Sequence, residues 1–175
     1  MAPAALALDI DGTIDTADRM QIRRLQTAAK RLRVPTYINT ARPPIYCERP
    51  DRLTTRLCPR SKHHCLVSKN VPYSKVQNMR SIQENAGVRE ESCCILIDDR
   101  PENIRGVNAA GYTGIKVEEL AGIQKETVDE AIETMRLCAA NPNMRGSGSC
   151  DVRRSLRAGI LVAIALLIAL YFILL

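Results

Sequence analysis

Apolar and polar positions along the first 140 residues follow two alternating patterns. Short apolar or β-branched runs, typical of buried strands, are separated by stretches in which apolar residues recur at helical spacing. The strand-like runs lie at residues 4–8, 34–40, 65–68, 93–97 and 113–117. The helical patterns lie at residues 16–32, 75–86, 103–110 and 127–140. Strands joined by helix-length crossovers predict an α/β fold, in which helices cover a parallel sheet of about five strands.

Local signals refine these boundaries. Gly87 is expected to end the second helix, and Thr127, with Glu130 three residues later, is expected to cap the last one. Residues 43–63 contain four prolines and show neither period, so they are predicted to be irregular.

The last 18 residues, 158–175, contain no charged or strongly polar side chain. As a helix they would extend about 27 Å, close to the thickness of a bilayer's hydrocarbon core, so we expect a transmembrane helix. Arg153, Arg154 and Arg157 precede it, and the positive-inside rule then places the rest of the chain in the cytosol. The expected organisation is a catalytic domain at 1–140, a flexible basic linker at 141–157 and a tail anchor at 158–175. The target organelle is not specified by the sequence.

Composition narrows the class of protein. Charged residues make up 25% of the chain and hydrophobic ones 46%, which favours a globular body over a disordered one. Half of the net charge of +6 comes from residue 141 onward, so the body is only mildly basic. Aromatic residues are scarce and tryptophan is absent, which argues against a base-stacking platform; no nucleic-acid partner is expected.

The seven cysteines are odd in number and irregular in spacing, so we expect a reducing compartment and no disulfide scaffold. Five potential zinc ligands gather in one stretch, at Cys47, Cys58, His63, His64 and Cys65. Their intervals differ from the paired spacing of structural zinc sites, and zinc is therefore not expected there.

Acidic residues follow two of the predicted buried strands. Asp9 and Asp11 come after the first, Asp98 and Asp99 end the fourth, and Thr40 ends the second. In open α/β sheets, ligands bind outside the carboxyl ends of the strands. Carboxylates gathered there repel one another unless a cation joins them, and Mg²⁺ prefers such oxygen ligands. The sequence therefore predicts a magnesium site at this edge.

These motifs in this order resemble the haloacid dehalogenase superfamily over residues 4–117. The resemblance implies a Rossmann-like sheet and a phosphatase in which Asp9 is the nucleophile and Asp11 the general acid and base. Asp9, Asp11, Asp99 and, in support, Asp98 would bind Mg²⁺. Thr40, a lysine and the backbone at Gly12 would hold the phosphoryl group.

The identity of that lysine stays open. Lys75 opens the helix before the Asp98 strand, where the superfamily places it, but Lys69 and Lys62 are close enough in sequence to compete. Arg42 is a candidate for contact with the substrate or an ordinary surface charge. Asn103 is a candidate for the same contact, a helix N-cap, or both.

The inserts after Asp11 and after Pro43 are too short for a large cap domain, so the resemblance is to small-cap or capless phosphatases. An open site suits a macromolecular or lipid phosphate ester, although a small ester would also fit. We therefore expect a Mg²⁺-dependent phosphomonoester hydrolase on the cytosolic face of a membrane. The alternative is a catalytically weak binding or scaffold protein with the same fold.

Overall fold

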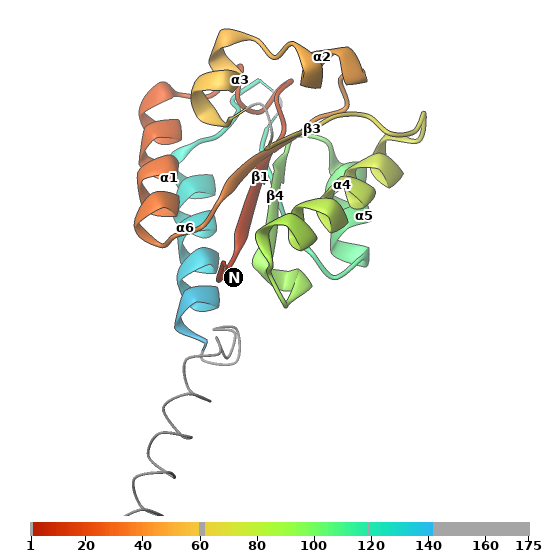
Figure 1. Cartoon of the computed structure of the whole chain (residues 1–175). Coiled ribbons are helices and arrows are strands. Elements are labelled where there is room, and N and C mark those ends of the chain that lie inside the picture. The colour runs from red at the N-terminus through yellow and green to blue at the C-terminus, as the bar shows by residue number, and fades with distance from the viewer. Residues whose placement is uncertain (1, 60–61, 119, 142–175) are drawn as a thin grey trace, which may run out of the picture. The chain divides into compact units, whose positions relative to one another are not determined.

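Five parallel strands form one sheet in the order β3-β2-β1-β4-β5 in the computed structural model, which describes residues 2–59, 62–118 and 120–141 (Figure 1). The strands are β1 (Ala5–Leu8), β2 (Thr36–Asn39), β3 (His63–His64), β4 (Cys94–Asp98) and β5 (Thr113–Lys116). Leu8 of the central β1 pairs with Ile38 of β2 and with Ile97 of β4. The predicted α/β class and the parallel sheet are confirmed.

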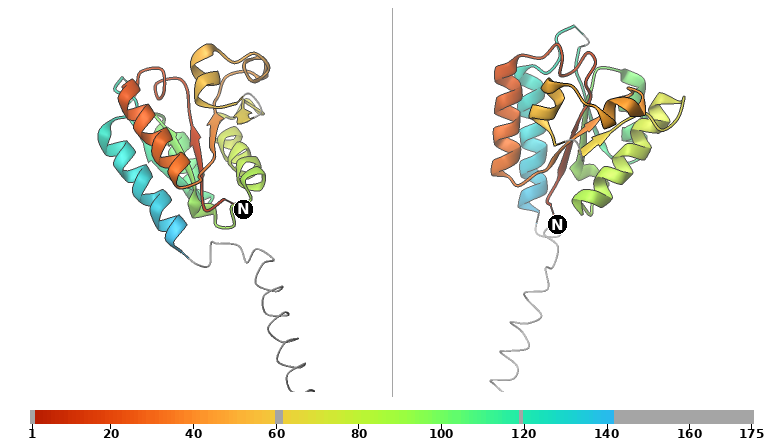
Figure 2. Two further views of the ribbon diagram at one scale, coloured as in Figure 1. Left: turned by 60° about the vertical axis from the view of Figure 1, so that its left-hand side comes forward. Right: turned by 45° about the horizontal axis from the view of Figure 1, so that its top comes forward.

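Helices cover both faces of this sheet. They are α1 (Arg19–Arg31), α2 (Pro44–Glu48), α3 (Arg52–Leu57), α4 (Val71–Ala86), α5 (Pro101–Ala109) and α6 (Lys125–Ala140), with a 3₁₀ turn at Glu91–Cys93. Helices α1 and α6 lie side by side on one face, and α4 and α5 lie on the other (Figure 2). The short α2 and α3 lie beyond the carboxyl ends of the strands, above the sheet in Figure 1. Side chains at that edge therefore lie under these two helices.

The boundaries of the main helices have local causes. The Asp18 side chain accepts a hydrogen bond from the Met20 N–H at 2.8 Å and caps α1. Asn70 caps α4 in the same way through the Tyr73 N–H, at 3.2 Å. Gly87 ends α4 with φ 67°, a left-handed conformation that favours glycine, as the sequence predicts.

Several predicted boundaries are wrong. Residues 43–63 are not irregular throughout, because they contain α2 and α3, and the Asp51 side chain caps α3 through the Thr54 N–H at 2.8 Å. Thr127 is not the cap of α6, which begins at Lys125 after Gln124. The third strand is His63–His64 rather than residues 65–68.

The structure contains two disulfides, although the cysteine pattern predicts no disulfide scaffold. Cys47 pairs with Cys65, and Cys93 pairs with Cys138, each across a Cα separation close to 6 Å (5.9 and 5.8 Å). The first bond joins α2 to the segment after β3, and the second joins the 3₁₀ turn before β4 to α6. The first pair also removes two of the five potential zinc ligands from the stretch that contains His63 and His64.

Within the described residues, no helix combines the length and the apolar character needed to cross a membrane. The predicted span at 158–175 lies outside those residues, as does the predicted linker apart from Asn141. Both stay predictions from the sequence.

Candidate active site

Asp9 lies at the carboxyl end of the central strand β1. Its backbone N–H donates to the Ile97 carbonyl at 3.0 Å, which extends the pairing of β1 with β4 by one residue. Its side chain is buried. The chain then turns, with the Ile14 N–H donating to the Ile10 carbonyl at 2.9 Å and Gly12 at φ 72°. Glycine takes this left-handed conformation without steric strain, so Gly12 permits the turn directly beyond Asp9.

Asp98 and Asp99 are both buried at the end of the neighbouring β4. The Asn103 side-chain amide donates to both Asp98 oxygens, at 3.0 and 3.2 Å, and the Arg100 N–H donates to one of them at 2.9 Å. Asn103 lies in the first turn of α5, and its amide holds Asp98 in place. Its predicted role as a helix N-cap is wrong, because the residue in that position is Arg100.

Lys75 lies between these carboxylates. Its side chain is 1% exposed, and its Nζ atom lies 2.8 Å from Asp9 Oδ1 and 2.8 Å from Asp98 Oδ2. Nζ also donates to the Asn39 carbonyl at 2.5 Å. The ammonium group therefore forms an ion pair with each of two carboxylates and one hydrogen bond with a backbone carbonyl. Of the three competing lysines, Lys75 is the one that the structure places in the acidic group.

Two buried asparagines that the sequence analysis did not identify support Lys75. The Asn39 side chain donates to the Lys75 carbonyl at 3.1 Å, and the Asn78 side chain donates to Asn39 Oδ1 at 3.0 Å and to the Cys65 carbonyl at 2.9 Å. The only sequence signal is weak: Asn39 is polar at the end of a buried strand, and Asn78 follows Lys75 by three residues on the same helix.

Carboxylate oxygens of Asp9, Asp98 and Asp99 all lie within 4.8 Å of one another, the one group of potential metal ligands found in the described part of the chain. Three carboxylates against one ammonium leave a formal net charge of −2. Burial raises the pKa of Asp9 from 3.8 to about 6; Lys75 lowers it and the Asp98 charge raises it further, so burial outweighs the attraction of the lysine. Three hard oxygen ligands and a missing charge of +2 fit one Mg²⁺ ion.

Asp11 lies apart from this group. Its side chain is 56% exposed and is held by Arg42, whose Nη2 is 2.5 Å from Asp11 Oδ1 and whose Nε donates to both oxygens, at 3.1 and 3.0 Å. Hydrogen bonding to Arg42 holds the pKa of Asp11 below its usual range. Asp11 was expected to bind Mg²⁺ together with Asp9, but the chain turns at Gly12 and Asp11 pairs with Arg42 instead. Its carboxylate does not join the potential ligand group.

Arg42 contacts further residues at the mouth of the site. Its Nη1 lies 3.4 Å from Asp51 of the α3 cap, and its guanidinium carbon lies 5.1 Å from the centre of the Tyr46 ring on α2. The arginine therefore joins the turn after β1 to the two helices beyond the sheet.

Thr40 is buried at the end of β2, as predicted, and its Oγ1 accepts from the Arg42 N–H at 3.3 Å. Two other buried oxygens, Thr13 Oγ1 and Asn103 Oδ1, have no hydrogen-bond partner among the described residues. Because Asn103 also contacts Asp98, its Oδ1 is an acceptor next to the acidic group. Such an atom is available to a ligand.

Comparison with protein-family models and with curated proteins finds no match. Two solved structures are similar in fold. An uncharacterised protein from Corynebacterium glutamicum matches with a TM-score of 0.57 and 21% identity, over 77% of this chain and 96% of that one. The core domain of a putative phosphoglycolate phosphatase from Streptococcus pneumoniae matches with a TM-score of 0.50 and 17% identity, over 77% and 98%. At these identities the likeness extends to the α/β fold and not to the activity.

Proposed function

We propose that the chain is a phosphomonoester hydrolase that requires Mg²⁺ and acts through an aspartyl-phosphate on Asp9. The observation that carries this proposal is the buried group of Asp9, Asp98 and Asp99 oxygens, within 4.8 Å of one another, with Lys75 between two of them. The resemblance of the motifs to the haloacid dehalogenase superfamily supports it. So does the fold shared with the core domain of a putative phosphoglycolate phosphatase.

Asp9 and Asp99 would hold the metal, with Asp98 in support. Asp98 is fully buried, accepts hydrogen bonds from Asn103 and Arg100 and is ion-paired with Lys75, so its carboxylate serves best to orient the others. When bound, Mg²⁺ supplies Lewis-acid neutralisation of phosphoryl charge. We retain Asp11 as a further candidate ligand, although its carboxylate would first have to leave Arg42.

The chain's own residues would carry the covalent steps. A carboxylate oxygen of Asp9 attacks phosphorus and forms the acyl phosphate, while the bond from phosphorus to the ester oxygen breaks. Asp11 gives the departing oxygen its proton. Water then attacks the acyl phosphate, Asp11 takes a proton from that water, and release of inorganic phosphate restores the Asp9 carboxylate.

Arg42 regulates the availability of Asp11 in this scheme. While it holds Asp11, the lowered pKa keeps that carboxylate ionised, whereas a general acid needs a proton. A phosphoryl group that draws Arg42 to itself would release Asp11. Thr40 and the backbone at Gly12 would bind phosphoryl oxygens, and Lys75 would join them if it gave up one of its present acceptors.

The membrane location belongs to the same proposal. The uncharged run at 158–175 and the arginines before it favour a single-pass anchor with the catalytic domain facing the cytosol. The substrate would be a phosphate ester on a protein or a lipid that this open site can reach.

A screen of phosphorylated compounds, with the purified full chain in nonionic detergent, tests the activity. Hydrolysis should occur with Mg²⁺, stop in EDTA and return when Mg²⁺ is added back, whereas a zinc-selective chelator should have no effect. A folded protein with no turnover on any compound would contradict the proposal and favour the binding-protein alternative. Loss of activity with the zinc chelator alone would instead assign a role to Cys58, His63 and His64.

A further inference from the structure

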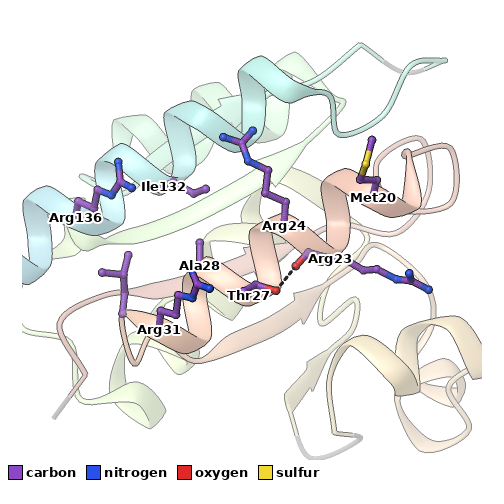
Figure 3. Close-up of a pocket in the computed structure, with 9 residues that line it drawn as sticks. Met20, Arg23, Arg24, Thr27, Ala28, Arg31, Ile132 and Arg136 are labelled. Atoms are coloured by element: carbon purple, nitrogen blue, oxygen red, sulfur yellow. Dashed lines mark hydrogen bonds between the residues drawn. The ribbon is translucent and has the colours of Figure 1, made fainter.

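A groove of about 640 Å³ lies between α1 and α6, and none of its lining residues belongs to the candidate active site (Figure 3). Among the described residues, no acidic side chain lines it, whereas four arginines do: Arg23, Arg24, Arg31 and Arg136. Ala28, Leu32 and Ile132 add apolar surface. The groove therefore combines basic and apolar surface.

A second hollow of about 400 Å³ lies between α1 and α3. It too is lined by arginines and by no acidic residue, and Arg23 lines both hollows. The second hollow adds Arg19, Arg52 and Arg56. The two hollows therefore form one basic band that crosses α1 and reaches α3. We call it the arginine band.

Most of this charge is not balanced by acidic residues of the described ranges. Arg24 pairs with Asp129 at 2.5 Å, and Arg136 lies 3.7 Å from Glu133. The other five arginines of the band have no ion pair with another residue of the described ranges. Arginine presents a planar fork that binds phosphate and carboxylate through two hydrogen bonds, so the band suits an anionic partner.

Helix α3 connects the arginine band with the candidate active site. Helix α3 contributes Arg52 and Arg56 to the second hollow, and its cap Asp51 contacts Arg42. Thr54 of the same helix lines a small hollow together with Thr40 and Arg42. Along α1 the larger groove extends from Met20 to Leu32, about 18 Å at the helical rise, which matches about five residues of extended chain.

We propose that the arginine band docks an acidic, phosphorylated polypeptide in extended conformation, so that the substrate of the proposed phosphatase is a phosphoprotein. That the docked polypeptide is also hydrolysed rests on the proposed function, whereas docking itself requires no turnover. Exposed apolar side chains in the band, Met20 and Leu53, suit a polypeptide that carries apolar as well as acidic residues. No aromatic side chain lines either hollow, which disfavours single-stranded nucleic acid because that ligand is held by base stacking.

The test compares the unmodified full chain with the double variant Arg23→Gln/Arg31→Gln, both in nonionic detergent. Both positions are exposed and without an ion pair in the described residues, and arginine and glutamine have similar helix propensity. The matched control is Arg89→Gln/Arg105→Gln, which removes two exposed charges outside the band. The probe is a fluorescein-labelled dodecapeptide of glutamate, leucine and two phosphoserines. Its binding is measured by fluorescence anisotropy at two salt concentrations.

We expect the Arg23→Gln/Arg31→Gln variant to bind the peptide about tenfold more weakly, or about 1.4 kcal/mol, and the control variant to match the unmodified protein. The ratio of kcat/KM on the phosphopeptide to kcat/KM on p-nitrophenyl phosphate should fall about tenfold in the first variant only. Peptide binding without any turnover would leave docking intact and contradict the proposed function instead. Equal weakening in both variants, or in neither, would overturn the docking proposal. So would tighter, Arg23-dependent binding of phosphatidylserine in mixed micelles or of oligouridylate.

Discussion

Asp9→Asn should abolish turnover and, in the metal-free protein at pH 8, raise the free energy of unfolding. An amide cannot attack phosphorus, so the covalent intermediate is lost. The stability effect comes from burial, which raises the pKa of Asp9 from 3.8 to about 6 even though Lys75 lies 2.8 Å away. The ionised side chain therefore destabilises the folded state, and an uncharged amide of nearly the same shape does not.

The size of the effect follows from proton linkage. Below pH 3.8 the carboxyl is neutral in both the folded and the unfolded states, and Asp9 contributes no pH dependence. As the pH rises toward about 6, the unfolded state ionises while the folded state keeps the proton, so stability falls. At about 1.4 kcal/mol per pH unit, that interval corresponds to ~3 kcal/mol. The stability of Asp9→Asn relative to the unmodified protein should therefore rise by about 2.4 kcal/mol between pH 4 and pH 8, because the unfolded carboxyl is already more than half ionised at pH 4.

Urea unfolding followed by tyrosine fluorescence, with both proteins in the same detergent and EDTA, measures this difference. Because the two chains share every other titrating group, the difference isolates Asp9. Saturating Mg²⁺ should stabilise the unmodified protein at pH 8 more than it stabilises the variant, since the ion needs the charged ligand. A difference that stays constant with pH would refute the inference that Asp9 carries a buried, destabilising charge. Retained turnover in the folded variant would refute its role as nucleophile.

Two further predictions concern the neighbours of Asp9. Lys75→Met should lower the free energy of unfolding at pH 7 by about 3–5 kcal/mol in the same assay, because it leaves buried carboxylates without their cation. The control Lys69→Met, at an exposed position, should change it by no more than about 0.5 kcal/mol. Equal effects of the two substitutions would contradict the ion pairing of Lys75 with Asp9 and Asp98. Arg42→Gln should raise the pKa of Asp11, so the alkaline limb of the kcat/KM profile, where a general acid loses its proton, should move to higher pH. An unmoved limb would show that Asp11 is not an acid restrained by Arg42.

The acidic residues at the ends of buried strands could be predicted well from the sequence. Buried apolar runs end at Asp9 and at Asp98, and parallel strands bring their carboxyl ends to one edge, so the acidic group follows from pattern and fold class together. The same reasoning failed for Asp11, because the position of its side chain depends on the turn at Gly12 rather than on strand alternation.

Features that depend on contacts between distant segments could not be predicted. Asn39 and Asn78 lie 39 positions apart, and neither forms a recognisable motif with Lys75. The pairing of Cys93 with Cys138 spans 45 residues and depends on how α6 packs beside the start of β4. The arginine band appears in the sequence only as scattered basic residues, since its hollows arise where α1 meets α3 and α6.

The ion pairs of Lys75 explain why a pair of acidic strand ends can be buried in a stable fold. Its ammonium group is paired with Asp9 and Asp98 and donates to the Asn39 carbonyl, so the lysine holds the two strand ends together and is engaged within the protein. It also balances only one of the three nearby carboxylate charges. A divalent cation at Asp9 and Asp99 would balance the other two, weaken the hold of Asp9 on the ammonium, and so free a donor for a phosphoryl oxygen. In this reasoning metal binding and phosphate binding are coupled through Lys75, and each should strengthen the other.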